Sequence, residues 1–497
     1  MNFERTSGVF CHLTSLPGEH GIGDLGAGAH DFLAFLDAAD QSLWQFCPLG
    51  PTASVHGHSP YSSPSTFAGN PLLVDLNALH DRGWLTAPEV APPEDADTAR
   101  VNYDAVATFK HDRLRTAFQR FEQSADAAAN DAFESFRERE ADWLADYTLY
   151  RALKRAHGEA SWTEWPRELR ERDPDALAAA REEHADELRY HAFVQWRFDE
   201  QWRALREAAR ERGIRLLGDV PMYAALDSAD VWANREAFAV DTAGNAEAVA
   251  GVPPNPGDEG QRWGMPVYDW DALAADDYDW WTRRLERLFD LVDVARLDHF
   301  KAFDAYWAIP AEEGASAADG EWRAGPDTAF FEHVRDELGD LPFVVEDLGF
   351  LDEGMLGLRD HFGFPGMRVP EYADWCAEHH RYKPSDYPRD CVAYTSTHDT
   401  DTATGYYRSL DSTQRDCFDY AVGVDDEAPA WALLDAVWDS PAVVAMTTVP
   451  DLLNLGSDAR LNTPGTAHGN WTWRVAPDRL DDDLADRLAD VTASARR

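Results

Sequence analysis

The sequence predicts an α/β protein built on a (β/α)8 TIM barrel with inserted helical subdomains and no C-terminal β-sandwich domain. Eight short runs are apolar almost throughout, as parallel strands covered on both faces should be. Helical stretches lie between many of them, and this alternation is typical of a closed barrel, although a doubly wound open sheet would give a similar pattern. The predicted strands are residues 8–14, 42–49, 214–220, 291–298, 341–347, 363–369, 390–397 and 442–449.

The helical elements divide the chain into three parts. Residues 1–74 should hold the first two strands, and residues 213–497 the remainder of the catalytic barrel, with helices such as the one expected over residues 280–291. Between them, residues 75–212 have apolar side chains at i, i+3 and i+4 with prolines at intervals, which predicts an inserted, mainly helical subdomain. The tail 478–497 is a polar amphipathic helix by the same pattern, so we expect no room for a separate β-sandwich domain after the barrel.

The charge balance excludes some partners. The chain carries 91 Asp and Glu residues against 45 Lys and Arg residues, a net charge of −46. Such a surface repels nucleic acid and anionic membranes, so we expect neither as a partner. Because the acidic residues are dispersed and lysine is scarce, we predict a halophilic protein that stays hydrated in concentrated salt.

The cysteines and the N-terminus bear on the compartment. The five cysteines (Cys11, Cys47, Cys376, Cys391 and Cys417) are odd in number and form no CxxC pair, which predicts neither a disulfide framework nor a zinc site. No signal-peptide pattern opens the sequence, and no apolar stretch of about 18 residues occurs. We therefore expect a cytoplasmic protein in a reducing compartment, without a metal ion or cofactor.

Charged side chains gather at the C-terminal ends of four predicted strands, where a barrel builds its active site. They are Asp219 in the third strand, Arg296, Asp298 and His299 in and after the fourth, Glu346 and Asp347 in the fifth, and His398 and Asp399 after the seventh. Such a cluster suits glycosyl transfer by two carboxylates, one a nucleophile and the other an acid and then a base. It also suits a metal site, as in metal-dependent isomerases.

Arg296 favours the glycosyl chemistry. Residues i and i+2 of a strand point the same way, so its guanidinium should lie beside the Asp298 carboxylate. A cation there should lower the pKa of Asp298, which suits a nucleophile and opposes a divalent metal. Glu346 has no evident arginine beside it in the sequence, so it should keep the raised pKa that an acid/base residue needs.

Ten segments carry a resemblance to a known family. They are HLTSLPGEHGIGDLG, WQFCPLGPT, SPYSSPSTFAGNPLLVDL, GDVP, GVPP…GQRWG, ARLDHF, VEDLG, FGFPGMRV, STHDTDT and DLLNLGSDARLNTPGTAHGNWTWR. Together they resemble the amylomaltases, or disproportionating enzymes, which are 4-alpha-glucanotransferases. The match runs in order from residue 8 to residue 474, nearly the whole chain.

The resemblance implies a retaining double displacement that moves α-1,4-glucan segments between malto-oligosaccharides, with glucose as an acceptor, through a covalent glycosyl-enzyme. It implies that Asp298 is the nucleophile, Glu346 the acid/base residue and Asp399 a third carboxylate that steadies the transition state. The implied substrate-binding residues are Tyr61, Asp219, Arg296, His398, Trp263, Gln261, Ser59, His299 and Asn462. Structural roles stay open for three of these: a turn for Ser59, a loop cap for His299 and loop support for Asn462.

The segment 251–264, GVPPNPGDEGQRWG, is expected to be a lid loop over the acceptor side. The family usually has Tyr and Phe in this lid, whereas this segment has neither. Transfer requires that a sugar outcompete water for the covalent intermediate, and a lid assists by excluding water. The sequence therefore leaves open an α-glucan hydrolase (α-glucosidase or amylase-like) that uses the same acids, and a non-catalytic glucan-binding protein.

Overall fold

Eight parallel strands close into a barrel in the computed structural model, which describes residues 4–93, 96, 99–424, 428–466 and 468–497. The order around the barrel is β1-β12-β11-β10-β9-β6-β3-β2, and each strand overlaps one of the eight predicted runs. The barrel prediction is therefore confirmed. The strands are β1 (Thr6–Phe10), β2 (Leu43–Gln45), β3 (Arg215–Val220), β6 (Val294–Leu297), β9 (Phe343–Val345), β10 (Gly366–Arg368), β11 (Cys391–Tyr394) and β12 (Val444–Thr448).

The barrel interior is a packed apolar core of its own. Leu43, Leu217, Val294 and Val344 are all fully buried in one cluster, separate from the cluster that joins the strands to the helices. Gly8 is required by this packing, because a Cβ atom there would lie 2.4 Å from Cβ of its register partner Leu43. The filled interior leaves the C-terminal mouth of the barrel as the place for a site.

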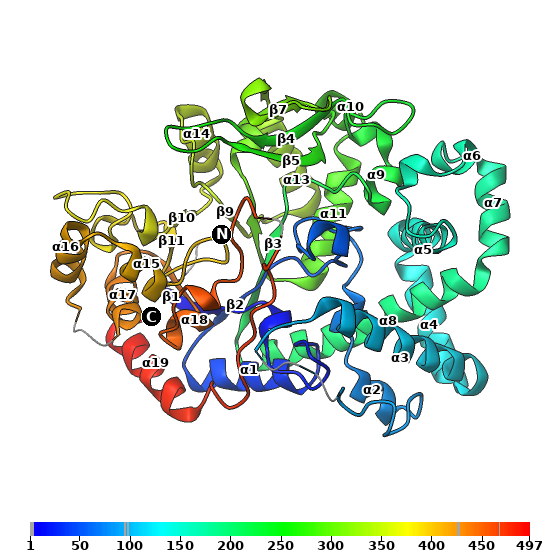
Figure 1. Ribbon diagram of the computed structural model, residues 1–497, viewed down its shortest axis with the longest axis horizontal. Coiled ribbons are helices and arrows are strands. Elements are labelled where there is room, and N and C mark those ends of the chain that lie inside the picture. Colours follow the sequence, from blue (N-terminus) through cyan, green and yellow to red (C-terminus); the bar gives the residue numbers. More distant parts are fainter. Residues whose placement is uncertain (1–3, 94–95, 97–98, 425–427, 467) are drawn as a thin grey trace.

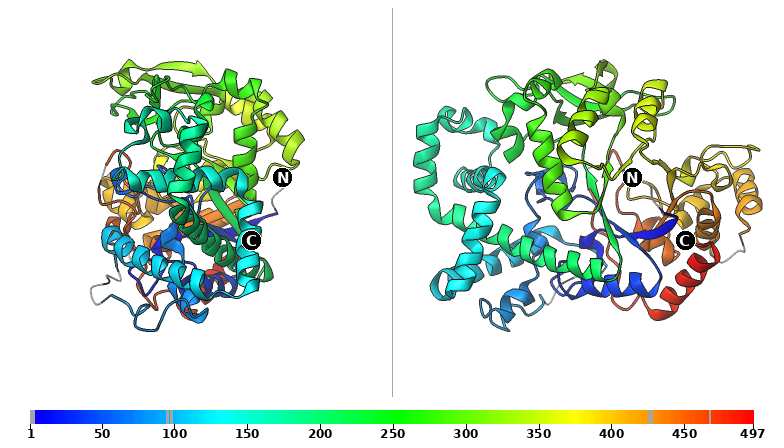
Figure 2. Two further views of the ribbon diagram at one scale, coloured as in Figure 1. Left: turned by 90° about the vertical axis from the view of Figure 1, so that its right-hand side faces the viewer. Right: turned by 180° about the vertical axis from the view of Figure 1, so that it is seen from behind.

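Helices surround the barrel, and the views from both sides agree on their arrangement (Figures 1 and 2). The predicted helix over residues 280–291 and the tail helix correspond to α11 and α19. None of the described helices is long and apolar enough to cross a membrane. The helices outside the 75–212 segment are α1 (Ala27–Ala38), α9 (Ala229–Ala233), α10 (Trp270–Ala275), α11 (Asp279–Leu291), α12 (Lys301–Asp304), α13 (Asp327–Leu338), α14 (Glu353–Phe362), α15 (Ala403–Ser409), α16 (Ser412–Val422), α17 (Pro429–Asp439), α18 (Val449–Leu452) and α19 (Asp482–Ser494).

The described residues between β2 and β3 form seven helices, which lie on the side of the barrel opposite α16 and α19 (Figure 1). They are α2 (Leu76–Asp81), α3 (Tyr103–Ser124), α4 (Ala127–Arg139), α5 (Ala141–Ala156), α6 (Arg167–Arg170), α7 (Pro174–Glu183) and α8 (Ala185–Glu211). Prolines mark breaks between them, since α7 begins at Pro174 with the Asp173 side chain accepting two backbone N–H bonds at its start. The long α8 also contacts α1, α11 and β3, so it serves as the barrel helix that precedes β3.

A buried ion pair ties α3 to the first barrel loops. Lys110, which is fully buried, donates to Asp24 Oδ2 at 2.7 Å and to the backbone oxygens of Leu72 and Val74 at 2.8 and 2.9 Å. Burial opposes ionisation of Asp24, but Lys110 holds the pKa of that carboxyl below its ordinary value. All three ammonium protons are therefore satisfied inside the protein.

The structure adds a second sheet that the sequence pattern did not predict. Four antiparallel strands in the order β5-β4-β7-β8 stand above the barrel mouth, at the top of Figure 1. They are β4 (Ala248–Val252), β5 (Gln261–Pro266), β7 (Ala305–Pro310) and β8 (Glu321–Ala324). The expectation of a lid loop over residues 251–264 is therefore corrected: both ends of that segment lie in paired strands, and residues 253–260 form the tip of a β-hairpin.

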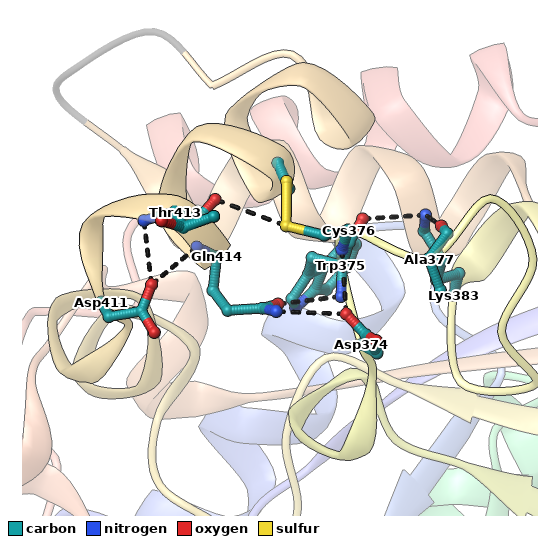
Figure 3. The surroundings of a disulfide bond; sticks show 9 residues. Asp374, Trp375, Cys376, Ala377, Lys383, Asp411, Thr413 and Gln414 are labelled. Carbon is teal, nitrogen blue, oxygen red and sulfur yellow. Dashed lines mark hydrogen bonds between the residues drawn. A yellow bond between two sulfur atoms is a disulfide. The ribbon is translucent and has the colours of Figure 1, made fainter.

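The cysteine expectation was also wrong in one respect, because Cys376 and Cys417 form a disulfide (Figure 3). Their sequence separation of 41 residues gives no motif, and the pairing results from packing. Trp375 packs edge-on against Phe418 at 4.5 Å between ring centroids, which brings the loop after β10 onto α16. The other three cysteines are buried and free.

Candidate active site

A cavity of about 700 Å³ opens at the C-terminal ends of the barrel strands, beneath the second sheet. It brings together ten of the twelve predicted site residues, which lie more than 400 positions apart at the extremes of the set. These ten are Ser59, Tyr61, Gln261, Trp263, Arg296, Asp298, His299, Glu346, Asp399 and Asn462. The other two, Asp219 and His398, are buried behind the cavity wall and are joined to it through Tyr61.

Arg296 bridges two carboxylates at the ends of β3 and β6. One of its terminal nitrogens donates to Asp219 at 2.7 and 2.9 Å and to Asp298 Oδ1 at 2.9 Å. This agrees with the expectation that residues i and i+2 of the strand point the same way. The expected pKa direction was wrong, however: burial raises the pKa of Asp298 to about 6, and Arg296 opposes this rise only in part. Asp219 and Asp399 add to the rise, which the strand pattern alone did not reveal.

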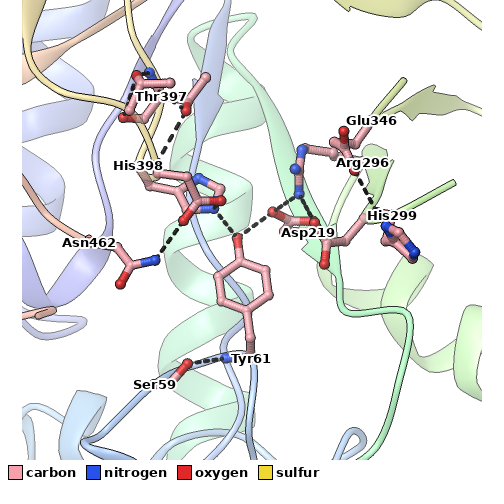
Figure 4. A network of polar contacts seen from close by, with 12 residues as sticks. Ser59, Tyr61, Asp219, Arg296, His299, Glu346, Thr397, His398 and Asn462 are labelled. Atoms are coloured by element: carbon pink, nitrogen blue, oxygen red, sulfur yellow. Dashed lines mark hydrogen bonds and ion pairs between the residues drawn. The ribbon is translucent and has the colours of Figure 1, made fainter. Parts of the chain in front are cut away.

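Glu346 extends from the end of β9 and is held by backbone donors. The N–H of Leu348 donates to its Oε1 at 2.7 Å. The N–H of His299 donates to its Oε2 at 3.1 Å (Figure 4). Burial raises the pKa of Glu346 to about 7 against the lowering effect of Arg296, and the Asp298 charge raises it further. The raised pKa expected for Glu346 is therefore confirmed. At neutral pH this carboxyl is poised between its two protonation states.

His299 holds a strained backbone conformation between Asp298 and the start of α12. Its φ of 48° lies in the left-handed region, which non-glycine residues rarely adopt. This turn directs its N–H to Glu346, and its Nε2 is buried with no hydrogen-bond partner among the described residues. The imidazole therefore leaves one polar atom for a molecule in the cavity, and its backbone positions the Glu346 carboxylate.

Asp399 lies on the far side of the cavity in a contrasting environment. Although burial opposes its ionisation, the neighbouring His398 holds the pKa of Asp399 well below its ordinary value. His398 Nε2 lies 3.0 Å from Asp399 Oδ2, and Asn462 Nδ2 donates to Oδ1 at 2.6 Å (Figure 4). This favours the ionised form of Asp399, whose position is fixed from two sides. The sequence left open whether Asn462 binds substrate or supports a loop. In the structure it supports Asp399 and also lines the cavity.

Tyr61 lies between Asp219 on one side and the His398–Asp399 pair on the other. Its hydroxyl donates to Asp219 Oδ2 at 2.6 Å and lies 2.8 Å from His398 Nε2. The Tyr61 ring stacks on the His398 ring at 5.2 Å, and its backbone N–H donates to Ser59 Oγ at 3.2 Å. This bond gives Ser59 the structural turn role that its sequence left open. The aromatic ring is thus fixed as a flat, apolar surface.

Gln261 and Trp263 reach the cavity from β5 of the second sheet. Trp263 Nε1 donates to Gln261 Oε1 at 2.9 Å, so the two side chains orient each other. The indole packs edge-on against the His299 ring at 4.9 Å, next to the residues that follow β6. The second sheet therefore supplies an aromatic group close to Glu346.

Sequence reasoning missed several cavity residues with large side chains, among them Lys301, Trp322, Phe350 and Tyr372. Lys301, Phe350 and Tyr372 follow the C-terminal ends of barrel strands, so the strand-end rule applied to longer loops could have found them. Trp322 lies on β8, and no barrel signal points to that strand. Among the residues that the structure describes, no three His, Cys, Asp or Glu side chains are grouped as they would be to hold a metal ion.

These features define a class of protein. A closed parallel barrel whose mouth carries a raised-pKa glutamate, an arginine-bound aspartate and flat aromatic side chains belongs with the (β/α)8 enzymes that process glycosidic bonds. Comparison with known proteins narrows the class. The pattern of the 4-alpha-glucanotransferase family matches residues 11–480.

Individual relatives agree over the full length. The 4-alpha-glucanotransferase of Thermus thermophilus is 42% identical over 506 aligned positions, covering 100% of both chains. That of Synechocystis sp. is 42% identical, with 98% of this chain and 97% of the relative covered. The amylomaltase of Streptococcus agalactiae, solved in complex with acarbose, superposes with a TM-score of 0.95 at 32% identity, covering 99% of this chain and 100% of that chain. The chain belongs to the 4-alpha-glucanotransferase family and is an enzyme that transfers glucan segments.

Proposed function

We propose that the cavity moves α-1,4-glucan segments between malto-oligosaccharides, with glucose as the smallest acceptor, by a retaining double displacement. In the first step the Asp298 carboxylate attacks the anomeric carbon, and the glycosidic bond breaks as Glu346 gives its proton to the departing oxygen. In the second step Glu346 takes the proton of an incoming 4-hydroxyl, whose oxygen displaces Asp298. The acid form of Glu346 is thereby regenerated.

One observation carries this assignment: the two carboxyl groups lie in one cavity in different electrostatic environments. Asp298 is bonded directly to the Arg296 guanidinium, which favours its ionised form. No cation among the described residues bonds Glu346, and its pKa of about 7 leaves a large fraction of it protonated at neutral pH. The first group therefore suits a nucleophile, and the second suits a proton donor and acceptor.

The remaining side chains support binding of the sugar that reacts. Tyr61 offers a flat ring to the C–H face of this sugar, while Asp399, held from behind by His398, faces its hydroxyl groups. Because Asp399 is ionised, it stabilises the positive charge that develops at the anomeric carbon in the transition state. His299 Nε2, which has no partner among the described residues, is a further donor or acceptor for the substrate.

Maltotriose tests the reaction class. Transfer predicts a ladder of longer and shorter oligosaccharides with some free glucose, whereas hydrolysis predicts only glucose and maltose. Asp298→Asn should lower the rates of both reactions by several orders of magnitude while leaving maltotriose binding measurable by calorimetry. Asp360→Asn, which removes an exposed carboxylate on α14, is the matched control and should retain full activity.

A glycosyl fluoride tests the role of Glu346. Fluoride departs without a proton, so Glu346→Gln should still form the glycosyl-enzyme and then fail to release it. Mass spectrometry of the intact variant should show one added glycosyl unit, which digestion should place on Asp298. A variant that turns over the fluoride as fast as the unsubstituted enzyme would refute the assignment.

A further inference from the structure

Trp322 is an exposed aromatic residue at the rim of the catalytic cavity, and it comes from outside the barrel. It lies on β8, the edge strand of the second sheet, and 42% of its surface is exposed. Single exposed aromatic residues are common on proteins, so exposure alone indicates no function. Trp322 differs in that its exposed surface lines the cavity that holds Asp298 and Glu346.

Neighbouring side chains fix the Trp322 ring. The Lys301 ammonium lies over the ring at 5.4 Å from its centroid and is itself bonded to Asp304 and Asp352. Trp307, the cross-strand partner of Trp322, packs against it at 5.3 Å with the ring planes 69° apart. Such contacts hold the indole in one orientation before any ligand arrives, which lowers the entropic cost of binding to it.

The position of Trp322 places it on the acceptor side of the reacting bond. Phe350, which packs edge-on against Trp322 at 6.1 Å, follows Glu346 by four residues in the loop after β9. Glu346 hands its proton to the departing chain and takes one from the acceptor, so the groups beyond it face the acceptor. Asn462, which bonds Asp399, lies on the opposite side from Glu346, with Tyr61 between them (Figure 4).

Trp322 also lies farther from the chemistry than Trp263. Trp263 packs on His299, whose N–H is bonded to Glu346, and it therefore adjoins the reacting bond. The ring contacts of Trp322 are instead with Lys301, Trp307 and Phe350. Trp263 and Trp322 lie on β5 and β8, the two outer strands of one four-stranded sheet, a separation of roughly 14 Å at the usual strand spacing. More than one sugar ring is needed to span that distance.

We propose that Trp322 is a stacking platform for an outer sugar of the acceptor glucan, beyond the sugar that reacts, and that it sets the preference for long acceptors. The inference rests on the proposed role of Glu346. It also accounts for a hairpin tip, residues 253–260, that carries no aromatic side chain. The strand at the other edge of the same sheet supplies the apolar surface that the tip lacks.

The test separates acceptor binding from donor binding. The donor is an α-maltosyl fluoride methylated at its non-reducing 4-hydroxyl, which can donate but cannot accept, and whose leaving group needs no acceptor-side contact. Glucose and maltotetraose are compared as acceptors. Trp322→Ala should raise KM for maltotetraose about tenfold, the effect of losing one aromatic contact of about 1.4 kcal/mol. KM for glucose should change less than about twofold, since its single ring reaches only the inner position.

Two further variants make the outcome specific. Trp322→Phe should restore most of the maltotetraose affinity because it keeps a ring, whereas Trp322→Leu should behave like the alanine variant. Trp263→Ala should raise KM for both acceptors. An equal rise for glucose and maltotetraose in Trp322→Ala, or no rise for maltotetraose, would overturn the inference. Failure of the proposed function would look different, because the unsubstituted enzyme would then transfer to neither acceptor and release only the free, 4-O-methylated maltose.

Discussion

Replacing Arg296 by methionine should move the ionisation of the nucleophile. The guanidinium bonds Asp298 at 2.9 Å and Asp219 at 2.7 Å, and its loss leaves both carboxylates without their cation. One charge-assisted hydrogen bond contributes about 1.5–3 kcal/mol, which corresponds to about one to two pKa units. The pKa of Asp298 should therefore rise from about 6 to about 7–8.

The sign of the effect on rate follows from the protonation states that the mechanism needs. Asp298 must be ionised, so kcat/KM falls as pH drops through its pKa, and Glu346 must be protonated, so kcat/KM for a glucan falls as pH rises through about 7. Arg296 lowers the pKa of Glu346, and ionised Asp298 raises it. In the variant Arg296 is absent and Asp298 is largely protonated, so these two effects offset each other. The alkaline limb of the pH profile therefore stays near pH 7. With Asp298 shifted by two units, maltotriose turnover should fall about fiftyfold at pH 6 and about tenfold at its best pH.

A maltosyl fluoride isolates the pKa shift of Asp298. Fluoride departs without a proton, so the fall of kcat/KM at alkaline pH, which reports Glu346, disappears. The lower limb should then move upward by one to two units in Arg296→Met, and Arg296→Lys should move it less, since a charge remains. Thermal melting of each variant controls for folding. If the limb stayed near pH 6 while only the plateau fell, Arg296 would act by positioning the substrate, and the electrostatic argument would fail.

Three further predictions concern stability. Lys110→Met should cost about 3–5 kcal/mol in urea unfolding, because it leaves the Asp24 carboxylate buried without its cation, and adding Asp24→Asn should recover part of the loss. Cys417→Ser should lower the free energy of unfolding by up to about 4 kcal/mol, the chain-entropy effect of a loop closed over 41 residues. Reduction of the unsubstituted protein with dithiothreitol should lower it by the same amount. An unchanged Tm in both cases would refute this. The melting temperature should rise between 0.1 and 2 M KCl, because salt screens the repulsion within a net charge of −46; a flat response would contradict the prediction of a halophilic protein.

The strands that could be predicted share one property: they are buried on both faces. Residues 391–394, for example, are all buried, and such strands appear in the sequence as continuous apolar runs. The second sheet lacks this property. Strand β8 has four exposed residues, Glu321 to Ala324, two of them charged, and it is defined only by pairing with β7. Pairing between distant segments leaves no local pattern, and the disulfide between Cys376 and Cys417 was missed for the same reason.

The same distinction divides the site. Asp298 and Glu346 were identified from their place at strand ends, since the barrel geometry brings those ends to one mouth. Their pKa values could be predicted only in part, because the rise at Asp298 depends on burial and on Asp219 and Asp399, which come from other strands. Trp322 could not be predicted at all, since the sheet that carries it is invisible in the sequence pattern. The groups that make and break the bond thus come from the predictable barrel. We infer that acceptor choice depends on the second sheet, which contributes Trp322 to the cavity without contributing a carboxylate to the chemistry.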